Sequence, residues 1–191
     1  MPDPLPVKTT ESSAPADKRG ILQKIAEFLH PSPENVPDLL VQLSQAESKG
    51  LIESDARSML EGVLRIGDMT AGDVMVAAPK IDLLNIDDGI EVLLEQVIET
   101  AHSRFPVYEG QRENIIGILL AKDLIKRIRS PELNLKTLLR PAVFVPESKR
   151  LNQLLREFKA NRNHLAVVID EFGQLAGLVT IEDVLEAIVG E

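Results

Sequence analysis

The 191-residue sequence contains no cysteine and no tryptophan, and its single tyrosine is Tyr108. The missing thiols exclude disulfide bonds, thiolate metal sites, iron–sulfur clusters and catalysis by cysteine, and they are typical of a reducing compartment. Acidic residues outnumber Lys and Arg by 30 to 21, which gives a formal net charge of −9. A surface this acidic, with few aromatic rings to stack on bases, argues against a nucleic-acid partner.

Long apolar segments are missing as well. The longest run covers residues 115–121, seven in all, and a membrane-spanning helix needs roughly 20. The N-terminus carries Asp3, Glu11 and several prolines in place of the basic start and apolar stretch of a secretory signal. We therefore expect a cytoplasmic protein that does not insert into a membrane.

Three kinds of segment follow one another along the chain. Residues 1–18 are rich in Pro, Ser and Thr and contain few apolar side chains, so they predict a disordered tail. Residues 19–66 show apolar side chains at helical spacing in three stretches, 21–29, 39–46 and 54–66. This pattern predicts a helical N-terminal segment in front of a main domain.

The main domain contains one pattern twice. An offset of 60 places the stretches 116–119 and 123–125 over 176–179 and 183–185. The same offset places 105–108 over 165–168, and Leu94 and Ile98 over Leu154 and Phe158. We interpret this unbroken register, interrupted only at 77–80, as two repeats, residues 67–130 and 135–191.

Each repeat reads as a β-α-β-β-α unit. In the second repeat we predict a strand at 143–145, a helix at 149–160 capped by Ser148, strands at 165–169 and 175–179, and a closing helix. A unit of this size cannot cover both faces of its sheet, so the two repeats should pack together. The predicted fold class is α/β (α+β), with tandem repeats after the helical segment.

The junction Gly177-Leu178-Val179-Thr180-Ile181-Glu182-Asp183 joins a buried strand to a helix. Thr180 and Asp183 have the spacing of a capping box, which needs no ligand. Alternatively, a carboxylate on the first helical turn can accept two hydrogen bonds from the hydroxyls of a ribose. In that interpretation Gly177 lets the ligand approach the backbone closely.

This junction, together with several other stretches, resembles the CBS domain pair of the CorC/HlyC magnesium and cobalt efflux proteins, in the CorC type without a membrane domain. The stretches are 61–64, 73–76, 101–109, 168–173 and 178–184, and the likeness spans about residues 58–191. The resemblance implies tandem CBS repeats that bind an adenine nucleotide, AMP or ATP, between them.

The resemblance also implies which residues form the cleft. They are Thr180 and Asp183 of the second repeat with Ile81, Asp82, Arg104, Tyr108 and Lys122 of the first. Arg104 would bind phosphates through its donor fork, Lys122 would add a point charge, and Tyr108 would pack on the nucleotide. Without the resemblance, Arg104 and Lys122 are also consistent with a solvated surface.

A second cleft related by the repeat is expected to be degraded. Leu120 replaces the threonine beside Asp123, and His164 and Glu182 replace the two phosphate-binding cations. A carboxylate and a mostly neutral histidine attract phosphate poorly. We therefore predict one nucleotide site per chain.

The sequence departs from the family at two places. Relatives usually read Met-h-Pro-Arg, where h is apolar, before the first strand, and here the chain reads Met75-Val76-Ala77-Ala78, so only Lys80 could replace the arginine. Relatives also continue beyond the position of Glu191 into a C-terminal domain, which we expect this chain to lack. His30, His102 and His164 do not have metal-ligand spacing, so we expect no protein-only metal site, and Mg²⁺ would arrive on nucleotide phosphates.

The resemblance favours a regulatory, non-enzymatic CBS pair of a magnesium and cobalt efflux protein. It implies a homodimer formed through the CBS pairs, a membrane transporter as partner, and a position in the cytoplasm at the inner face of the membrane. Two alternatives stay open. One is a purely structural dimerisation module in which Thr180 and Asp183 only cap a helix. The other is a Mg²⁺-dependent nucleotide hydrolase, for which no general base is evident.

Overall fold

The computed structural model describes residues 33–190. The predicted tail, the helix expected over 21–29 and Glu191 lie outside the described residues. The chain divides into two units, residues 1–46 and 47–191. The described part of the first unit is mainly helix α2 (Val36–Ser48), which covers the predicted stretch 39–46.

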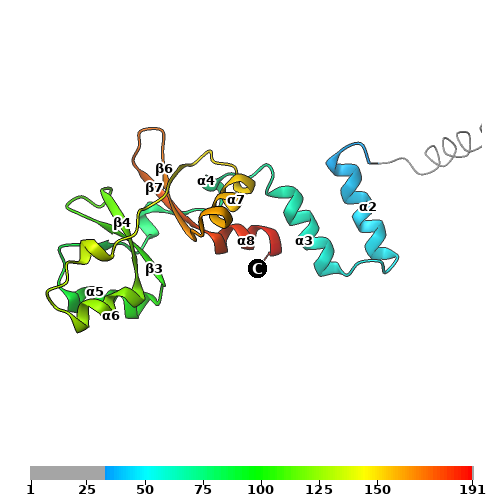
Figure 1. Ribbon diagram of the computed structural model, residues 1–191. Coiled ribbons are helices and arrows are strands. Elements are labelled where there is room, and N and C mark those ends of the chain that lie inside the picture. Colours follow the sequence, from blue (N-terminus) through cyan, green and yellow to red (C-terminus); the bar gives the residue numbers. More distant parts are fainter. Residues whose placement is uncertain (1–32, 191) are drawn as a thin grey trace, which may run out of the picture. The chain divides into compact units, whose positions relative to one another are not determined.

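In the second unit, helix α3 (Ser54–Arg65) precedes the two repeats (Figure 1). The first repeat comprises α4 (Ala71–Val74), β1 (Val76–Ala77), η1 (Ala78–Lys80), β2 (Leu84–Asn85), α5 (Ile90–Thr100), β3 (Arg104–Tyr108), β4 (Ile115–Leu120), η2 (Ala121–Asp123) and α6 (Leu124–Arg129). The second comprises η3 (Leu135–Leu138), β5 (Phe144–Pro146), α7 (Leu151–Asn161), β6 (Leu165–Ile169), β7 (Leu175–Thr180) and α8 (Ile181–Val189).

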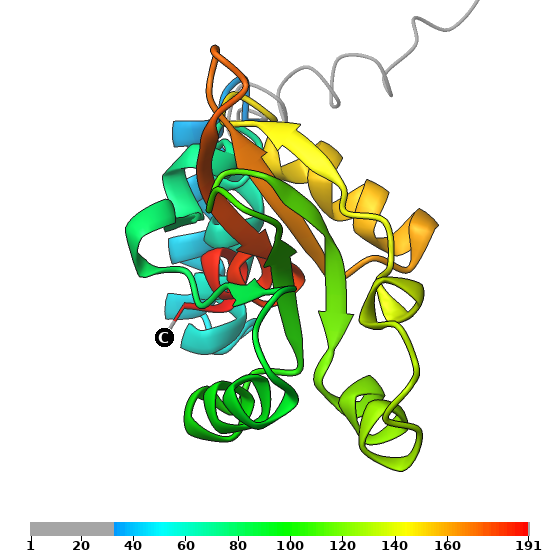
Figure 2. The same cartoon turned by 90° about the vertical axis from the view of Figure 1, so that its left-hand side faces the viewer.

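The strands form two mixed sheets, with the orders β2-β3-β4 and β1-β7-β6-β5. In each sheet one pair is parallel and the hairpin pair is antiparallel, as a β-α-β-β unit requires. Helices α5 and α6 lie next to β3 and β4, apart from α7 (Figures 1 and 2). The mixed α/β architecture of two repeats is confirmed.

Three apolar clusters hold the second unit together. One packs α5 and α6 on the first sheet, and one packs α4, α7 and α8 on the second. The third lies between the two sheets, because Ile81 and Ile118 from the first repeat contact Leu165 and Val167 from the second. The repeats therefore bury a common core, as the size of each unit predicted.

Two offsets, not one, relate the repeats. Val107 pairs with Gly117 and Val168 pairs with Gly177, so β3 and β6 correspond at an offset of 61 while β4 and β7 correspond at 60. The hairpin turn is one residue shorter in the second repeat, and everything before it shifts accordingly. The predicted unbroken register is therefore wrong for the first half of each repeat.

Helices α5 and α7 show the same shift. Leu93 and Leu154 occupy equivalent core positions and are both fully buried. Ile98, which the constant offset matched with the buried Phe158, is 76% exposed. Helix α7 also begins later than predicted, and its N-cap is Arg150, without a side-chain cap, instead of Ser148. A pattern of apolar residues does not reveal a one-residue shift where apolar residues are adjacent, because the shifted alignment still matches apolar residues with each other.

Each repeat's leading segment crosses to the other repeat's sheet. β1 pairs with β7, Ala77 opposite Gly177, and Arg140 forms a bridge with Ile118 on β4. A Cβ atom on Gly177 would lie 2.5 Å from Met75 Sδ and 2.7 Å from the Val76 carbonyl oxygen. Gly177 therefore makes room for the chain itself, and the prediction that it admits a ligand is wrong. The crossing carries residues 80–82 between the two sheets.

Candidate functional site

A cavity of about 430 Å³ lies between the repeats, within the range of roughly 300–1,000 Å³ common for ligand sites. Both repeats line it. The lining residues are Val76, Lys80, Ile81, Asp82, Ala101, His102, Ser103, Arg104 and Pro106 from the first, and His164, Leu165, Leu178, Thr180, Glu182 and Asp183 from the second. Five of the seven residues predicted for the main cleft are among them: Ile81, Asp82, Arg104, Thr180 and Asp183.

The Thr180–Asp183 pair stands where β7 runs into α8. Both the backbone N–H and the hydroxyl of Thr180 donate to Asp183 Oδ2, at 2.6 and 2.7 Å, and the Asp183 N–H donates to Thr180 Oγ1 at 3.2 Å. The predicted capping box is thus present. Within the described residues Asp183 Oδ1 has no protein partner. One oxygen therefore serves the helix and the other is available to a ligand.

A second capping box shows that the cap alone does not make a cavity. Thr70 and Asp73 form the same arrangement at the start of α4, with the Thr70 N–H 2.7 Å from Asp73 Oδ2. Asp73 is exposed and Thr70 half-buried, and neither lines the cavity between the repeats. Hydrogen bonds from the Thr70 backbone and hydroxyl hold the pKa of Asp73 below its ordinary range.

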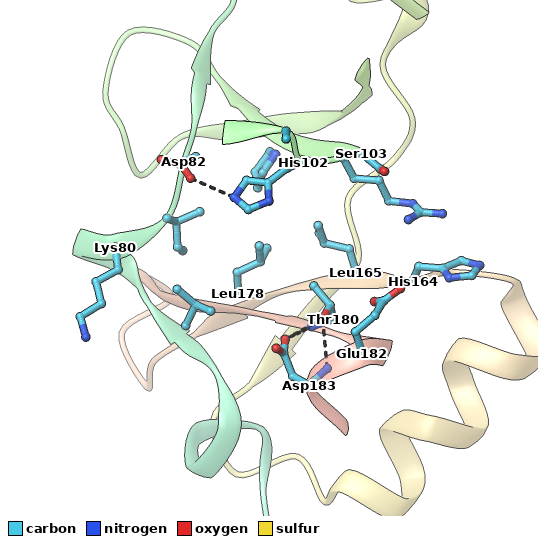
Figure 3. A pocket seen from close by; sticks show the side chains of 15 residues that line it. Lys80, Asp82, His102, Ser103, His164, Leu165, Leu178, Thr180, Glu182 and Asp183 are labelled. Carbon is cyan, nitrogen blue, oxygen red and sulfur yellow. Dashed lines mark hydrogen bonds and ion pairs between the residues drawn. The ribbon is translucent and has the colours of Figure 1, made fainter. Parts of the chain in front are cut away.

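Asp82 faces Thr180 and Asp183 from the opposite wall of the cavity (Figure 3). Its Oδ2 atom lies 3.0 Å from His102 Nε2, and the two side chains are 48% and 58% exposed. Arg112 Nη2 donates to the carbonyl oxygen of the neighbouring Ile81 at 2.6 Å, which fixes the segment. The polar walls therefore come from different repeats, and a bound molecule would touch both.

Apolar side chains separate these polar walls. Leu165 on β6 and Leu178 on β7 lie between the Asp82–His102 pair and the Thr180–Asp183 pair (Figure 3). Leu178 and Thr180 share a face of β7 because alternate residues of a strand point the same way. The two-residue periodicity could have indicated Leu178 as a lining residue once Thr180 had been proposed.

Arg104 and Lys80 are the cations of the cavity lining. Neither side chain forms an ion pair or a hydrogen bond within the part of the chain that the structure describes. Three carboxylates share the same lining, those of Asp82, Glu182 and Asp183. A bound anion would thus be attracted locally by Arg104 and Lys80, not by the cavity as a whole.

Tyr108 does not line the cavity. It stands at the other end of β3 from Arg104, about 13 Å away at the usual rise of roughly 3.3 Å per residue. There it packs against the core cluster between the sheets, which includes Ile81 and Ile118. The geometry does not support the predicted contact of Tyr108 with a nucleotide.

Lys122, His164 and Glu182 also lie elsewhere than predicted. Lys122 lines a neighbouring cavity of about 400 Å³, together with His102, Ser103, Arg104, Leu120 and Ala121. His164 and Glu182, assigned to the degraded second cleft, line the first cavity instead. His164 corresponds to Ser103 and not to Arg104, because the offset before the hairpin is 61.

The second cleft has lost more than its threonine. At the corrected offset Val143 replaces Asp82 and Leu165 replaces Arg104, so both are apolar. Asp123 is only 5% exposed, and Lys126 Nζ and Arg140 Nη2 lie 2.8 and 3.8 Å from its two oxygens. Two cationic side chains of the chain itself thus form ion pairs with this carboxylate.

The sequence indicated Lys80 only as a replacement for the arginine of the relatives, and it did not indicate His102 or Ser103 as residues that line the cavity. No group of three or more His, Asp or Glu side chains within residues 33–190 could hold a metal ion. In the same range, no helix combines the length and apolar character needed to cross a bilayer.

Comparison with known protein families shows to which family the chain belongs. Residues 71–130 and 135–190 match the CBS domain model, and residues 31–66 match the N-terminal region of NMB0537. The chain belongs to the CBS domain family. The chain is 42% identical over 185 residues to the magnesium and cobalt efflux protein CorC of Pasteurella multocida (strain Pm70), covering 95% of this chain and 62% of that protein. The resemblance to CorC proteins is confirmed, and the chain spans about three fifths of that relative's length.

Solved structures of CBS domains also resemble this chain. The CBS domain of a bacterial CNNM/CorC family Mg²⁺ transporter superposes with a TM-score of 0.75 at 33% identity, covering 83% of this chain and 98% of that chain. The same kind of domain in complex with ATP gives 0.67 at 34% identity, with 71% and 98% covered. A CBS-domain pair with bound AMP from Klebsiella pneumoniae gives 0.56 at 28% identity, with 64% and 99% covered.

Proposed function

We propose that this CBS pair binds one adenine nucleotide in the cavity between its repeats and thereby regulates divalent-cation efflux by a CorC-type protein. The observation that carries the proposal is the Asp183 carboxylate, which caps α8 with one oxygen and leaves the other at a cavity lined by both repeats. ATP in one related CBS domain and AMP in another support the choice of ligand.

The lining suggests how the nucleotide lies. Asp183 Oδ1 accepts hydrogen bonds from the ribose hydroxyls, and the base packs on the apolar surface that includes Ile81 and Leu178. The guanidinium of Arg104 binds the first phosphate through its donor fork. Asp183 and Leu178 belong to the second repeat and Ile81 and Arg104 to the first, so the ligand bridges the two repeats.

Bridging gives a mechanism of regulation. A ligand that touches both repeats stabilises the relative orientation of the two sheets in which all its contacts form. A neighbouring domain or subunit that contacts both repeats would respond to that orientation. We propose a homodimer of CBS pairs and a membrane transporter partner at the cytoplasmic face of the membrane as the receivers, with Mg²⁺ arriving on the nucleotide phosphates. The role requires no turnover of the nucleotide.

Calorimetric titration of the purified chain with AMP, ADP and ATP, each with and without Mg²⁺, tests the proposal. We expect saturable binding near one nucleotide per chain. Asp183→Ala should weaken binding at least about tenfold, because it removes charge-assisted hydrogen bonds.

Asp73→Ala is the matched control, since it removes an equivalent capping carboxylate outside the cavity. It should leave the affinity within about twofold, and circular dichroism should show both variants folded. If no nucleotide binds the unsubstituted chain, or if both variants lose affinity equally, Thr180 and Asp183 serve only the helix and the structural alternative holds.

A further inference from the structure

Residues 80–82, hereafter the 80–82 segment, separate two cavities. They line the cavity of about 430 Å³ between the repeats (Figure 3), and they also line a cavity of about 420 Å³ that extends to helix α5. After Lys80, the last residue of η1, residues 81–83 belong to no helix or strand. Because there is space on both sides of the segment, its position depends on contacts made by individual side chains.

Arg112 makes such a contact from the hairpin turn between β3 and β4. Its Nη2 atom donates to the Ile81 carbonyl oxygen at 2.6 Å, and it lines the cavity next to α5 but not the cavity between the repeats. A hydrogen bond from a charged donor is stronger than one between neutral groups. In a trans peptide the C=O and N–H groups point in opposite directions, so this bond also sets the direction of the Asp82 N–H.

The turn that carries Arg112 is itself held in place. The Glu109 N–H donates to the Asn114 carbonyl oxygen at 3.2 Å, and Asn114 Nδ2 donates to the Glu109 carbonyl oxygen at 2.9 Å. The Glu109 carboxylate also forms an ion pair with Lys136, beyond the first repeat. Arg112 therefore projects from a turn with its own supports, and it can hold the 80–82 segment instead of moving with it.

The second repeat lacks an equivalent contact. Its hairpin turn, residues 170–174, is one residue shorter and contains no Lys or Arg. At the offset of 61 the counterpart of Ile81 is Ala142, and within residues 33–190 no side chain donates to the Ala142 carbonyl oxygen. The arginine contact thus accompanies the repeat whose leading segment lines the proposed nucleotide site, and it is missing where the cleft has lost its polar wall.

We infer that Arg112 is a positioning residue for the nucleotide site, which it serves through the Ile81 carbonyl without touching the ligand. The inference rests on the proposed function, in which the base packs on Ile81. Without the Arg112 contact the 80–82 segment can move towards either cavity, and a nucleotide must immobilise it on binding. That ordering lowers the affinity for every nucleotide by the same factor, whatever its number of phosphates.

Calorimetric titration with AMP and with ATP, at one Mg²⁺ concentration, compares the unsubstituted chain with Arg112→Gln and Arg112→Lys. We expect Arg112→Gln to weaken the binding of both nucleotides about fivefold, because a part-buried hydrogen bond no longer preorganises the site. Arg112→Lys keeps a cationic donor on a long side chain, so both affinities should stay within about twofold. Circular dichroism and urea denaturation show whether each variant is folded at the titration temperature.

Arg129→Gln is the matched control, because it removes one exposed cation and lines neither cavity. It should change neither affinity by more than about twofold. A larger loss for ATP than for AMP in Arg112→Gln would show that the arginine acts as a charge on the phosphates, and it would overturn the inference. Unchanged affinities in a folded Arg112→Gln chain, or equal losses in Arg112→Lys, would overturn it as well and leave the proposed function standing. If the unsubstituted chain binds neither nucleotide, both proposals fail together.

Discussion

The strand-to-helix junctions of the two repeats carry an aspartate at the equivalent position and use its carboxylate in opposite ways. Asp183 follows a threonine, is held by that threonine through one oxygen and keeps the other open to a cavity. Asp123 follows Leu120, is buried, and is bound by Lys126 and Arg140. A few side chains therefore decide whether a repeated junction becomes a ligand site or an internal ion pair.

The difference extends to the walls that face each junction. Opposite Asp183 stand Asp82, His102 and Arg104, which are polar and partly solvated. The positions equivalent to Asp82 and Arg104 in the other repeat are Val143 and Leu165, and Leu165 is part of the core between the sheets. A duplicated fold can lose one site without loss of stability when apolar contacts replace the polar wall.

The largest expected effect concerns the glycines that let the leading segments cross. In Gly177→Ala the new methyl group meets the Val76 carbonyl at 2.7 Å, and in Gly117→Ala it meets the Arg140 carbonyl at 2.9 Å. Because overpacking against backbone cannot relax easily, we expect losses of unfolding free energy of about 3 and about 1–2 kcal/mol. Urea denaturation measures both.

Gly67→Ala is the control for these two variants, because its nearest neighbour would lie at 3.4 Å and its backbone is unstrained. It should change the unfolding free energy by less than about 0.5 kcal/mol. Equal losses for all three variants would mean that the crossing segments do not constrain the sheets as the comparison of the repeats requires.

An intermediate loss of stability is expected when the junction of the first repeat is given the threonine of the second. Leu120→Thr creates a Thr-x-x-Asp junction, but it buries a hydroxyl in place of an apolar side chain that is 7% exposed. We expect a loss of about 2 kcal/mol in unfolding free energy. Calorimetry should still show one nucleotide per chain, because Val143 and Leu165 supply no polar wall. A second bound nucleotide would show that the threonine alone separates the repeats.

The smallest effect concerns the exposed capping box and its dependence on pH. Hydrogen bonds from Thr70 lower the pKa of Asp73 below its ordinary value of 3.8. The unfolded chain keeps the ordinary value, so the stabilisation is complete above that pH and is lost as the pH falls through the folded-state pKa. The difference in unfolding free energy between the unsubstituted chain and Asp73→Asn should shrink as denaturation is repeated below about pH 4. A difference that stays constant with pH would contradict this account.

Much of the site was predictable because its residues belong to local motifs. Thr180 and Asp183 are three positions apart on one helical turn, and the capping chemistry that relates them depends on nothing else in the chain. Lys122 and His164 were misplaced for the opposite reason. The wall that each of them joins depends on how one repeat packs on the other. For His164 it also depends on the length of the hairpin turn at residues 109–114 relative to its counterpart at 170–174.

The sequence by itself determined the elements, their repetition and the capping carboxylates, because helical and strand periodicity and side-chain caps act over a few residues. Only the tertiary structure decided the one-residue shift between the repeats, the crossing of β1 to β7, and the apolar packing of Tyr108. These features arise from contacts between segments that are far apart in the sequence. β1 and β7, for example, are separated by about 100 residues. Such contacts form according to which apolar surfaces fit together, and no local pattern records that fit.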